Sequence, residues 1–467
     1  MSVQLEAKKA AIKKVAIEKT PSLVQTCEEL VELARKAGAG EAEAFAERTR
    51  ESSVKVRDGQ VEELQQATSK GVGLRVISSG RLGFAYGTDF SRAGLKALAE
   101  SALALSKVAA KDDSNALPRG AQLGFSKGAE GDYDPAIEAI DPAWKLNAAR
   151  ACEKAAASVD PRVRKFDSTG AGDFIARSAI ASSRGASGES RASYAFLHCS
   201  PVGEADGQLQ TASWSDTRRT LAKLQRPEEV GRIAAEKAAR MLGARKLKTQ
   251  KAAVIFDPRM AAGFIGGLAD AFNGDLIHKK SSFLGASLGK RIASKSITLI
   301  DDATLWGGLG TRPFDGEGVA SQRNVVIEEG ILKLFLYDTQ TARKAKARST
   351  GNATRGWSSL PSIGTSNFFL MAGSESPEQI IAGTKRGLYV TAMLGRGADV
   401  VTGDYSRGAN GLWIEDGKIV HPVQEVTVSG SLLEMLAGID AVGSDLDLRS
   451  RTAAPTLRFA ELQISGT

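Results

Sequence analysis

The sequence predicts an α+β protein of two domains. With 467 residues, the chain is longer than one hydrophobic core normally serves. Helix-like and strand-like segments follow one another in the first half, and strand-like runs outnumber helices in the second, which is typical of this class. We expect a basic N-terminal tail or helix over residues 1–20, a mixed helix and antiparallel-sheet domain over 21–245, and a mainly antiparallel, barrel-like sheet domain over 246–467.

The first half begins with a helix and a meander of short strands. Residues 25–36 have apolar side chains on one helical face, and Gly38 follows the last turn. Asp58-Gly59 and Ser79-Gly80 are turn signals between apolar runs. The predicted elements are a helix over 25–36, strands over 43–50, 52–57, 61–66, 71–77 and 82–86, and a helix over 91–108.

Two proline-led helices enclose the remaining strands of the first half. Asp141 and Pro142 are an N-cap and a first-turn proline, and Pro227 begins the clearest helix of the chain. The basic segment 245–250 after that helix is the predicted domain boundary. The predicted elements are a helix over 141–158, strands over 163–169, 173–182 and 192–199, and a helix over 227–242.

The second half is richer in strands. Glu329-Gly330 and Asp416-Gly417 join apolar, β-branched runs and predict hairpins. The glycine-rich segment 307–318 lacks a GK[ST] sequence and a strand-to-helix context, so it predicts a flexible loop near the cleft rather than a nucleotide site. The predicted strands are 252–257, 324–328, 331–336, 387–393, 412–415, 418–420, 423–429 and 455–464, and the predicted helices are 259–272, 341–346, 377–384 and 431–437.

Composition excludes several classes of protein. Hydrophobic residues make up 42% and charged residues 25%, as in ordinary globular proteins. The sequence has no run of 18 apolar residues and its first 20 residues do not resemble a secretory signal, so we expect a cytoplasmic protein without a membrane span. The three cysteines, Cys27, Cys152 and Cys199, are widely spaced, which argues against a disulfide framework and a thiolate zinc site.

The net charge of +8 raises the question of nucleic acid binding. Much of the excess lies in segments 218–251 and 343–355. No zinc-finger, RRM or bZIP pattern accompanies this charge, so nucleic acid is not the expected partner.

Segment 323–370 holds the most informative loop. After the hairpin at Glu329-Gly330 comes a short helical stretch, then the sequence STGNATR over 349–355, then Asn367 before another apolar run. A polar loop between strands often carries substrate contacts, although a solvated basic connection has the same composition.

The order of these features resembles the TldD/PmbA family, whose members are described as modulators of DNA gyrase and as peptide-processing metalloproteases. The resemblance extends over most of residues 40–467. It includes Val56, Asp58-Gly59, Gly71-Val-Gly73, Arg75-Val76 and Gly83-Phe84 in the first half, and Ser281–Leu284, Gly289, Ile297-Thr298 and Asp301-Asp302 in the second.

The resemblance implies a zinc site that this chain lacks. Zinc-bearing TldD-like members carry an HExxxH motif on the helix after the first strand of the second domain, and a further Cys ligand near the C-terminus. The equivalent positions here are Ile265, Gly266 and Asp270, and no Cys follows Cys199. This pattern is expected of the PmbA (TldE) branch, whose members pair with a zinc-bearing TldD-like chain.

The resemblance therefore implies a non-catalytic subunit of a zinc metalloprotease that degrades or matures unfolded peptides. We expect no cofactor in this chain, zinc in a TldD-like partner, and either that heterodimer or a homodimer. Extended peptides are the expected ligands, held by backbone bonds at strand edges. By motif, the candidate peptide contacts are Thr350, Asn352, Arg355 and Asn367.

Other readings stay open. His278 is the best remaining candidate metal ligand, with Asp270, although a lone His among lysines is more often a surface residue. For Asp301 and Asp302 a turn or N-cap role is favoured over a metal site, because adjacent strand residues point to opposite faces.

The alternative function is a regulatory binding protein that contacts DNA gyrase or nucleic acid through basic residues, Arg343, Lys344 and Lys346 among them.

Overall fold

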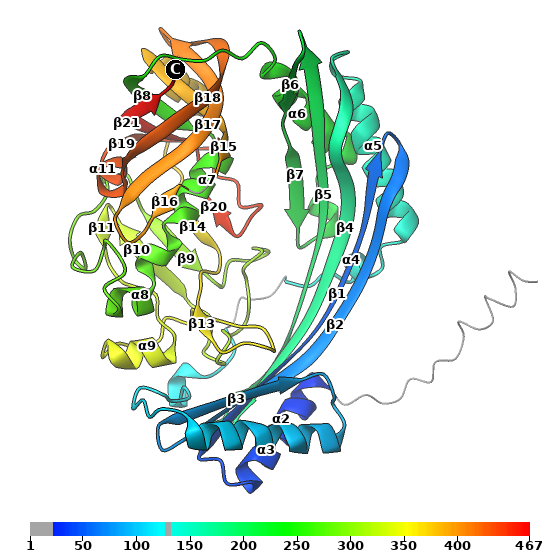
Figure 1. Cartoon of the computed structure of the whole chain (residues 1–467), viewed down its shortest axis with the longest axis vertical. Helices are drawn as coiled ribbons and strands as arrows, with labels where there is room; N and C mark the ends of the chain where they lie inside the picture. The colour runs from blue at the N-terminus through cyan, green and yellow to red at the C-terminus, as the bar shows by residue number, and fades with distance from the viewer. Residues whose placement is uncertain (1–21, 127–131, 396) are drawn as a thin grey trace, which may run out of the picture.

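The computed structural model describes residues 22–126, 132–395 and 397–467, and the predicted tail over 1–20 lies outside them. The predicted α+β class is confirmed, with helices and largely antiparallel sheets in two lobes (Figure 1). The first lobe is built on a seven-stranded sheet of order β3-β2-β1-β4-β5-β6, with β7 paired to β5. Its strands are β1 (Glu41–Arg57), β2 (Gln60–Ser78), β3 (Arg81–Gly87), β4 (Val163–Ser182), β5 (Ser187–Ala205), β6 (Gln208–Thr211) and β7 (Trp214–Arg218).

The strands of the first lobe are longer than the sequence suggested. The predicted breaks at 51, 67–70 and 170–172 are wrong, because β1, β2 and β4 run through them without interruption. Gly170 and Gly172 lie inside β4, where a Cβ would come within 2.6 Å of the His198 ring and 2.5 Å of the Phe196 ring. These glycines therefore make room for neighbouring rings rather than forming a turn.

Helices cover one face of this sheet. Side chains alternate between the two faces of a strand, and one set packs under α2 and α3, and under α5 and α6. Ser22 caps α2 with a reciprocal capping box, and Pro142 and Pro227 lie in the first turns of their helices, as predicted. No helix within the described residues is both long and apolar enough to span a membrane. The helices are α2 (Leu23–Lys36), α3 (Arg92–Val108), α4 (Pro135–Glu138), α5 (Pro142–Ala157) and α6 (Pro227–Arg240).

The second lobe contains the predicted barrel. Strands β15, β8, β21, β18 and β17 pair in that order, and β17 pairs again with β15, so the five strands close on themselves. β8 and β15 are parallel, and the other pairs are antiparallel. The barrel strands are β8 (Gln250–Phe256), β15 (Arg386–Leu394), β17 (Asp404–Glu415), β18 (Lys418–Ser431) and β21 (Leu457–Ser465), with β16 (Ala398–Asp399) and β19 (Ile439–Val442) at the margins.

A second, five-stranded sheet of order β11-β10-β9-β14-β20 completes this lobe. The predicted hairpin at Glu329-Gly330 is confirmed as β10 and β11, although β11 is shorter than predicted. These strands are β9 (Leu299–Asp302), β10 (Arg323–Glu328), β11 (Ile331–Leu332), β14 (Phe368–Leu370) and β20 (Thr452–Ala453), with the separate pair β12 (Ala353–Thr354) and β13 (Ser362–Ile363). The helices are α7 (Pro258–Gly267), a 3-10 turn (Ala269–Phe272), α8 (Gly274–His278), α9 (Thr339–Lys344), α10 (Pro377–Ala382) and α11 (Leu432–Ala437).

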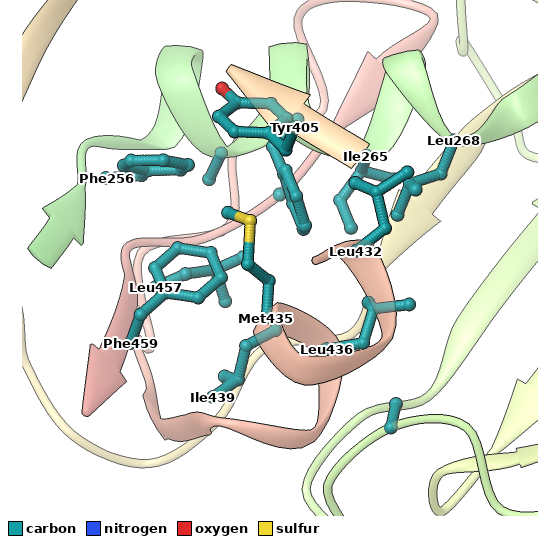
Figure 2. Close-up of a cluster of buried hydrophobic side chains, with 14 of the residues drawn as sticks. Phe256, Ile265, Leu268, Tyr405, Leu432, Met435, Leu436, Ile439, Leu457 and Phe459 are labelled. Carbon is teal, nitrogen blue, oxygen red and sulfur yellow. The ribbon is translucent and has the colours of Figure 1, made fainter. Parts of the chain in front are cut away.

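The core of the second lobe packs α7 and α11 against the barrel. Phe256, Tyr405, Met435 and Phe459 gather with residues of α7 in one cluster of buried side chains (Figure 2). Phe256 and Phe459 lie edge to face, with ring centroids 4.8 Å apart. Helix α7 therefore packs its buried face, with Ala261, Phe264 and Ile265, into the hydrophobic core.

One histidine of the first lobe predicts a pH dependence of stability. The Nε2 atom of His198 lies 2.9 Å from the Ser168 hydroxyl, and the ring lies over Gly170. Burial, and to a smaller extent the charge of Lys55, lowers the pKa of His198 below its ordinary value of 6.5. Below pH 6.5 the unfolded chain takes up this proton more readily than the folded chain, so this site makes the protein less stable as the pH falls.

Replacing His198 should flatten that dependence. We expect His198→Gln to lose less free energy of unfolding between pH 7.5 and 5.5 than the wild type, because glutamine cannot take up the proton. Urea denaturation at the two pH values measures the difference. His278→Gln, at an exposed helix end, is the control and should follow the wild type. Parallel losses in all three proteins would contradict the assignment.

Candidate functional site

A cleft of three adjoining cavities lies between the first sheet and the second lobe. Their volumes are about 290, 550 and 380 Å³. The first and second cavities share Leu309 and Arg451, and the second and third share Lys237, Asp257, Arg259 and Tyr389. In Figure 1 the long strands of the first sheet curve around this side of the second lobe. The shared lining residues make the three cavities one continuous cleft.

The floor of the first cavity is the uncovered face of the first sheet. Glu47 on β1, Ser178 on β4 and Ser190 on β5 are paired in register across the sheet. Phe174 and Tyr194 are also paired, and their rings are stacked with centroids 4.9 Å apart. The small side chains of the floor leave a shallow trough, and the Phe174 and Tyr194 rings form one end of it. The remaining floor residues are Phe45, Ala176 and Ala192.

The predicted peptide contacts Asn352 and Asn367 lie inside the wall of the cleft. Asn352 is 1% exposed, and its Nδ2 donates to Asp301 Oδ2 at 2.6 Å and to the Gly364 carbonyl at 3.0 Å. Asn367 is 2% exposed, and its Oδ1 accepts from the Gly310 amide at 2.7 Å. The Nδ2 of Asn367 donates to the Asp302 carbonyl and to Thr311 Oγ1.

Both asparagines therefore hold loops together within the chain. The Oδ1 of Asn352 also accepts from Thr350 Oγ1 at 2.7 Å and from Asn324 Nδ2 at 3.2 Å. An amide offers two donors and two acceptor positions, so the capacity of Asn352 is used within the protein. Contact of Thr350, Asn352 and Asn367 with a peptide stays a prediction, and the structure gives these residues a supporting role behind the cleft surface.

Asp301 anchors this wall and differs from its predicted turn role. It is fully buried at the end of β9 and accepts from Asn352, from the Ser366 amide at 2.6 Å and from the Ser366 hydroxyl at 3.0 Å. Burial raises the pKa of Asp301. Asp302 does form a turn, because its Oδ1 accepts from the Thr304 amide at 2.8 Å.

The predicted flexible loop 307–318 lines the cleft, but most of it is buried. Arg219 donates to the carbonyls of Gly308 at 3.2 Å and Leu309 at 2.7 Å, which fixes the loop to the end of β7. Asp315 Oδ1 accepts from the amides of Glu317 and Val319, so the second part of the loop is also held. The segment is therefore a loop at the cleft, as predicted, and distant polar side chains satisfy its backbone groups.

Arg355 is the predicted residue that the structure does place at the cleft. Its side chain is completely buried and pairs with Glu43 of β1 at 2.6 Å. Arg75 of β2 bridges Glu43 at 3.0 Å and Glu317 at 2.9 Å. We call Glu43, Arg75, Glu317 and Arg355 the interlobe cluster, because it joins strands of the first sheet to loops of the second lobe. Burial and the charge of Glu317 raise the pKa of the neighbouring Asp315.

The three positions equivalent to the zinc motif do not form a metal site. Ile265 is 1% exposed and points into the core cluster (Figure 2). Gly266 lies beside Thr452, and Asp270 is exposed on the following 3-10 turn. Isoleucine and glycine side chains offer no ligand atom. Within the described residues, no group of three His, Cys, Asp or Glu side chains is placed to hold a metal ion. His278 therefore has no such group around it among these residues.

Two of the basic residues of the alternative function are held by contacts within the chain. Lys344 lies 3.5 Å from Asp112, and Arg343 donates to the Asp113 carbonyl at 3.0 Å. Sequence reasoning missed other cations, Arg219, Arg312 and Arg451, which line the first cavity with Arg355. These arginines are far apart in sequence and belong to no motif, so only the fold reveals their proximity.

The buried role of Asn352 can be tested by mutation. We expect Asn352→Ala to lower the free energy of unfolding by about 2–3 kcal/mol, because Asp301 loses a donor to a buried carboxylate. Ser358→Ala, on the exposed part of the same loop, is the control and should change stability by less than about 0.5 kcal/mol. Urea denaturation followed by circular dichroism gives both values. Unchanged stability with weaker peptide binding would instead favour the direct contact.

Comparisons with known proteins agree with this architecture. Three family models match the chain: PmbA/TldA metallopeptidase domain 1 over residues 42–106, the central domain over 135–242, and the C-terminal domain over 249–466. Metalloprotease PmbA of Escherichia coli O157:H7 is 32% identical over 94% of this chain and 96% of that protein. A Metalloprotease TldD homolog of Haemophilus influenzae is 25% identical over 91% and 93%.

A solved structure also matches over nearly the whole chain. It is a putative modulator of a DNA gyrase from Thermotoga maritima, with a TM-score of 0.87, 27% identity, and coverage of 94% of this chain and 99% of that one. The family models together match most of the described residues, and the Escherichia coli relative matches almost end to end. The chain therefore belongs to the TldD/PmbA family of metallopeptidases.

Proposed function

We propose that this chain is a non-catalytic PmbA/TldE-type subunit of a zinc metalloprotease that degrades or matures unfolded peptides. Ile265 and Gly266 carry the proposal, because the equivalent positions of zinc-bearing members hold a ligand and a general base, and these two side chains can be neither. The zinc, its ligands and the base would come from a TldD-like partner chain.

The similarity to known relatives supports this branch of the family. Identity is 32% to the PmbA of Escherichia coli and 25% to the TldD homolog of Haemophilus influenzae, over similar lengths. The chain also has no cysteine after Cys199, and burial raises the pKa of that thiol to about 12, which disfavours the thiolate that zinc requires.

In this proposal the cleft of the chain binds the peptide substrate. An extended peptide would lie on the uncovered face of the first sheet, against the wall formed by Arg355, Thr365 and Ser366. The backbone groups of β1 and β4 are already paired within the sheet, so side chains of the floor and wall would make the contacts with a peptide in this position. The chain would thus hold substrate, and the partner would cleave it.

The isolated chain should not retain zinc. After dialysis against dilute zinc and then against buffer, we expect far less than one zinc per chain, because no ligand set is available at 265, 266 and 270. Atomic absorption on the purified protein measures the content. About one tightly held zinc per chain would overturn the proposal and direct attention to His278 and Asp270.

Mixing with a zinc-bearing TldD-like chain from the same source should produce proteolysis. We expect each chain alone to leave a fluorescein-labelled unfolded polypeptide intact, and the mixture to cleave it in a chelator-sensitive way. Ala176→Trp, which fills the cleft floor, should reduce the rate at least tenfold, and Ala97→Trp on exposed α3 should not. Chelator-sensitive cleavage by this chain alone would refute the subunit role.

A further inference from the structure

Four arginines from separate parts of the chain converge on the first cavity of the cleft. Arg219 follows β7, Arg312 lies in the buried loop, Arg355 follows β12, and Arg451 precedes β20. The fold brings these four arginines together, since they lie in separate segments and share no local sequence pattern. Like charges this close repel one another, so the arrangement is costly unless something compensates it.

The chain itself compensates only one of them with a carboxylate. Arg355 pairs with Glu43, whereas within the described residues Arg219, Arg312 and Arg451 have no Asp or Glu oxygen within 4.0 Å. Arg219 is 5% exposed and bonds only to backbone carbonyls, among them Asp132 at 2.9 Å. Nε of Arg312 is buried without a hydrogen-bond partner.

The acidic residues of the cavity form no ion pair with these arginines. Glu47 and Asp315 also line it, and within the described residues neither has a carboxylate oxygen within 4.0 Å of Arg219, Arg312 or Arg451. Burial raises the pKa of both carboxyl groups, and the charge of Arg312 acts in the opposite direction on Asp315. Burial lowers the pKa of Arg219 to about 10, and the positive charge of Arg451 adds to this effect. Arg451 itself is exposed to the cleft, so a ligand can reach it.

The remaining surface suits part of a peptide. The trough of small side chains ends at the stacked pair Phe174 and Tyr194, which offers an apolar contact beside the cations. Arginine binds carboxylates through paired hydrogen bonds, and such charge-assisted bonds are stronger than neutral ones. An anionic group on an extended peptide would neutralise this cavity.

We propose that the first cavity is a carboxylate-recognition subsite, in which Arg451, supported by Arg219 and Arg312, binds a carboxylate of an extended peptide. The carboxylate comes from an Asp or Glu side chain or from the C-terminus of the peptide, since both have the same chemistry. This inference rests on the proposed function for its peptide ligand, and it adds to that function a preference for peptides that carry a carboxylate.

Fluorescence anisotropy with three labelled peptides tests the subsite on the full chain without a partner. Each is an unstructured decapeptide with fluorescein at its N-terminus. The first has a central Glu and an amidated C-terminus, the second has Gln and an amidated C-terminus, and the third has Gln and a free C-terminal carboxylate. We expect the first or the third to bind about tenfold more tightly than the second. Preference for the first assigns the side-chain carboxylate, and preference for the third assigns the C-terminus.

Variants connect the preference to the cavity. Arg451→Gln should weaken the carboxylate-bearing peptide more than the uncharged peptide and so remove the preference, and Arg451→Lys should retain part of it because the charge remains. Arg348→Gln, at an exposed arginine outside the three cavities, is the matched control. Thermal unfolding checks that each variant is folded, which the exposure of Arg451 leads us to expect.

Several results would overturn the inference. These are equal binding of the three peptides, equal weakening of all three by Arg451→Gln, or Arg451-dependent binding of a labelled single-stranded oligonucleotide with no peptide preference. The assay does not involve the partner, so its outcome is separate from reconstituted proteolysis. If reconstituted proteolysis fails and the carboxylate preference is found, the subunit role is refuted and the subsite is supported. If proteolysis is found and the carboxylate preference is absent, the subsite is refuted and the subunit role is supported.

Discussion

The interlobe cluster is the interaction on which the cleft depends. Arg355 and Arg75 share Glu43, and Arg75 also reaches Glu317, so two strands of the first sheet are tied to two loops of the second lobe. The charges are buried, and removing one partner from such a group typically costs about 3–5 kcal/mol. Specific geometry rather than net stability is the best-supported benefit of such buried pairs. Here that geometry sets the distance between the floor and the wall of the cleft.

Close packing beside the cluster reinforces the same junction. Trp357 lies directly against Gly71 and Gly73 of β2, where no side chain larger than hydrogen fits. Phe45, Ile180 and Phe314 form a small hydrophobic group across the junction, with Trp357 against it. The indole occupies the space that a side chain at 71 would need, and the Trp357 carbonyl and the Phe84 ring occupy that space at 73. The lobes are thus joined by both charge and shape.

Helix α7 packs one of its faces into the core of the second lobe. The position equivalent to a zinc ligand carries Ile265, and its side chain completes the core between the barrel and α11. A hydrophobic residue there stabilises the fold, whereas a histidine would need a polar partner in the same buried space. The three adjoining cavities remain, with their floor on one lobe and their wall on the other.

Local patterns predicted most elements, and the errors have a common cause. The helices beginning at Pro142 and Pro227 and the hairpin at Glu329-Gly330 follow from capping and turn chemistry, which acts within a few residues. The strand break at 170–172 was wrong because Gly170 and Gly172 accommodate rings from β5, and the break at 67–70 was wrong because these residues pair with β1, contacts that local reasoning does not reveal. Local composition likewise did not indicate that most of loop 307–318 is buried, since Arg219 fixes it from another part of the chain.

The sequence by itself determined the fold class, the family and the lack of ligand atoms at 265 and 266. These depend on residue identity and on order along the chain, which are read directly from the sequence. Only the tertiary structure decided that Asn352 and Asn367 face inward and that Arg219, Arg312 and Arg451 meet in one cavity. Which side chains turn toward one another depends on packing between strands and loops hundreds of residues apart, and no local pattern encodes that arrangement.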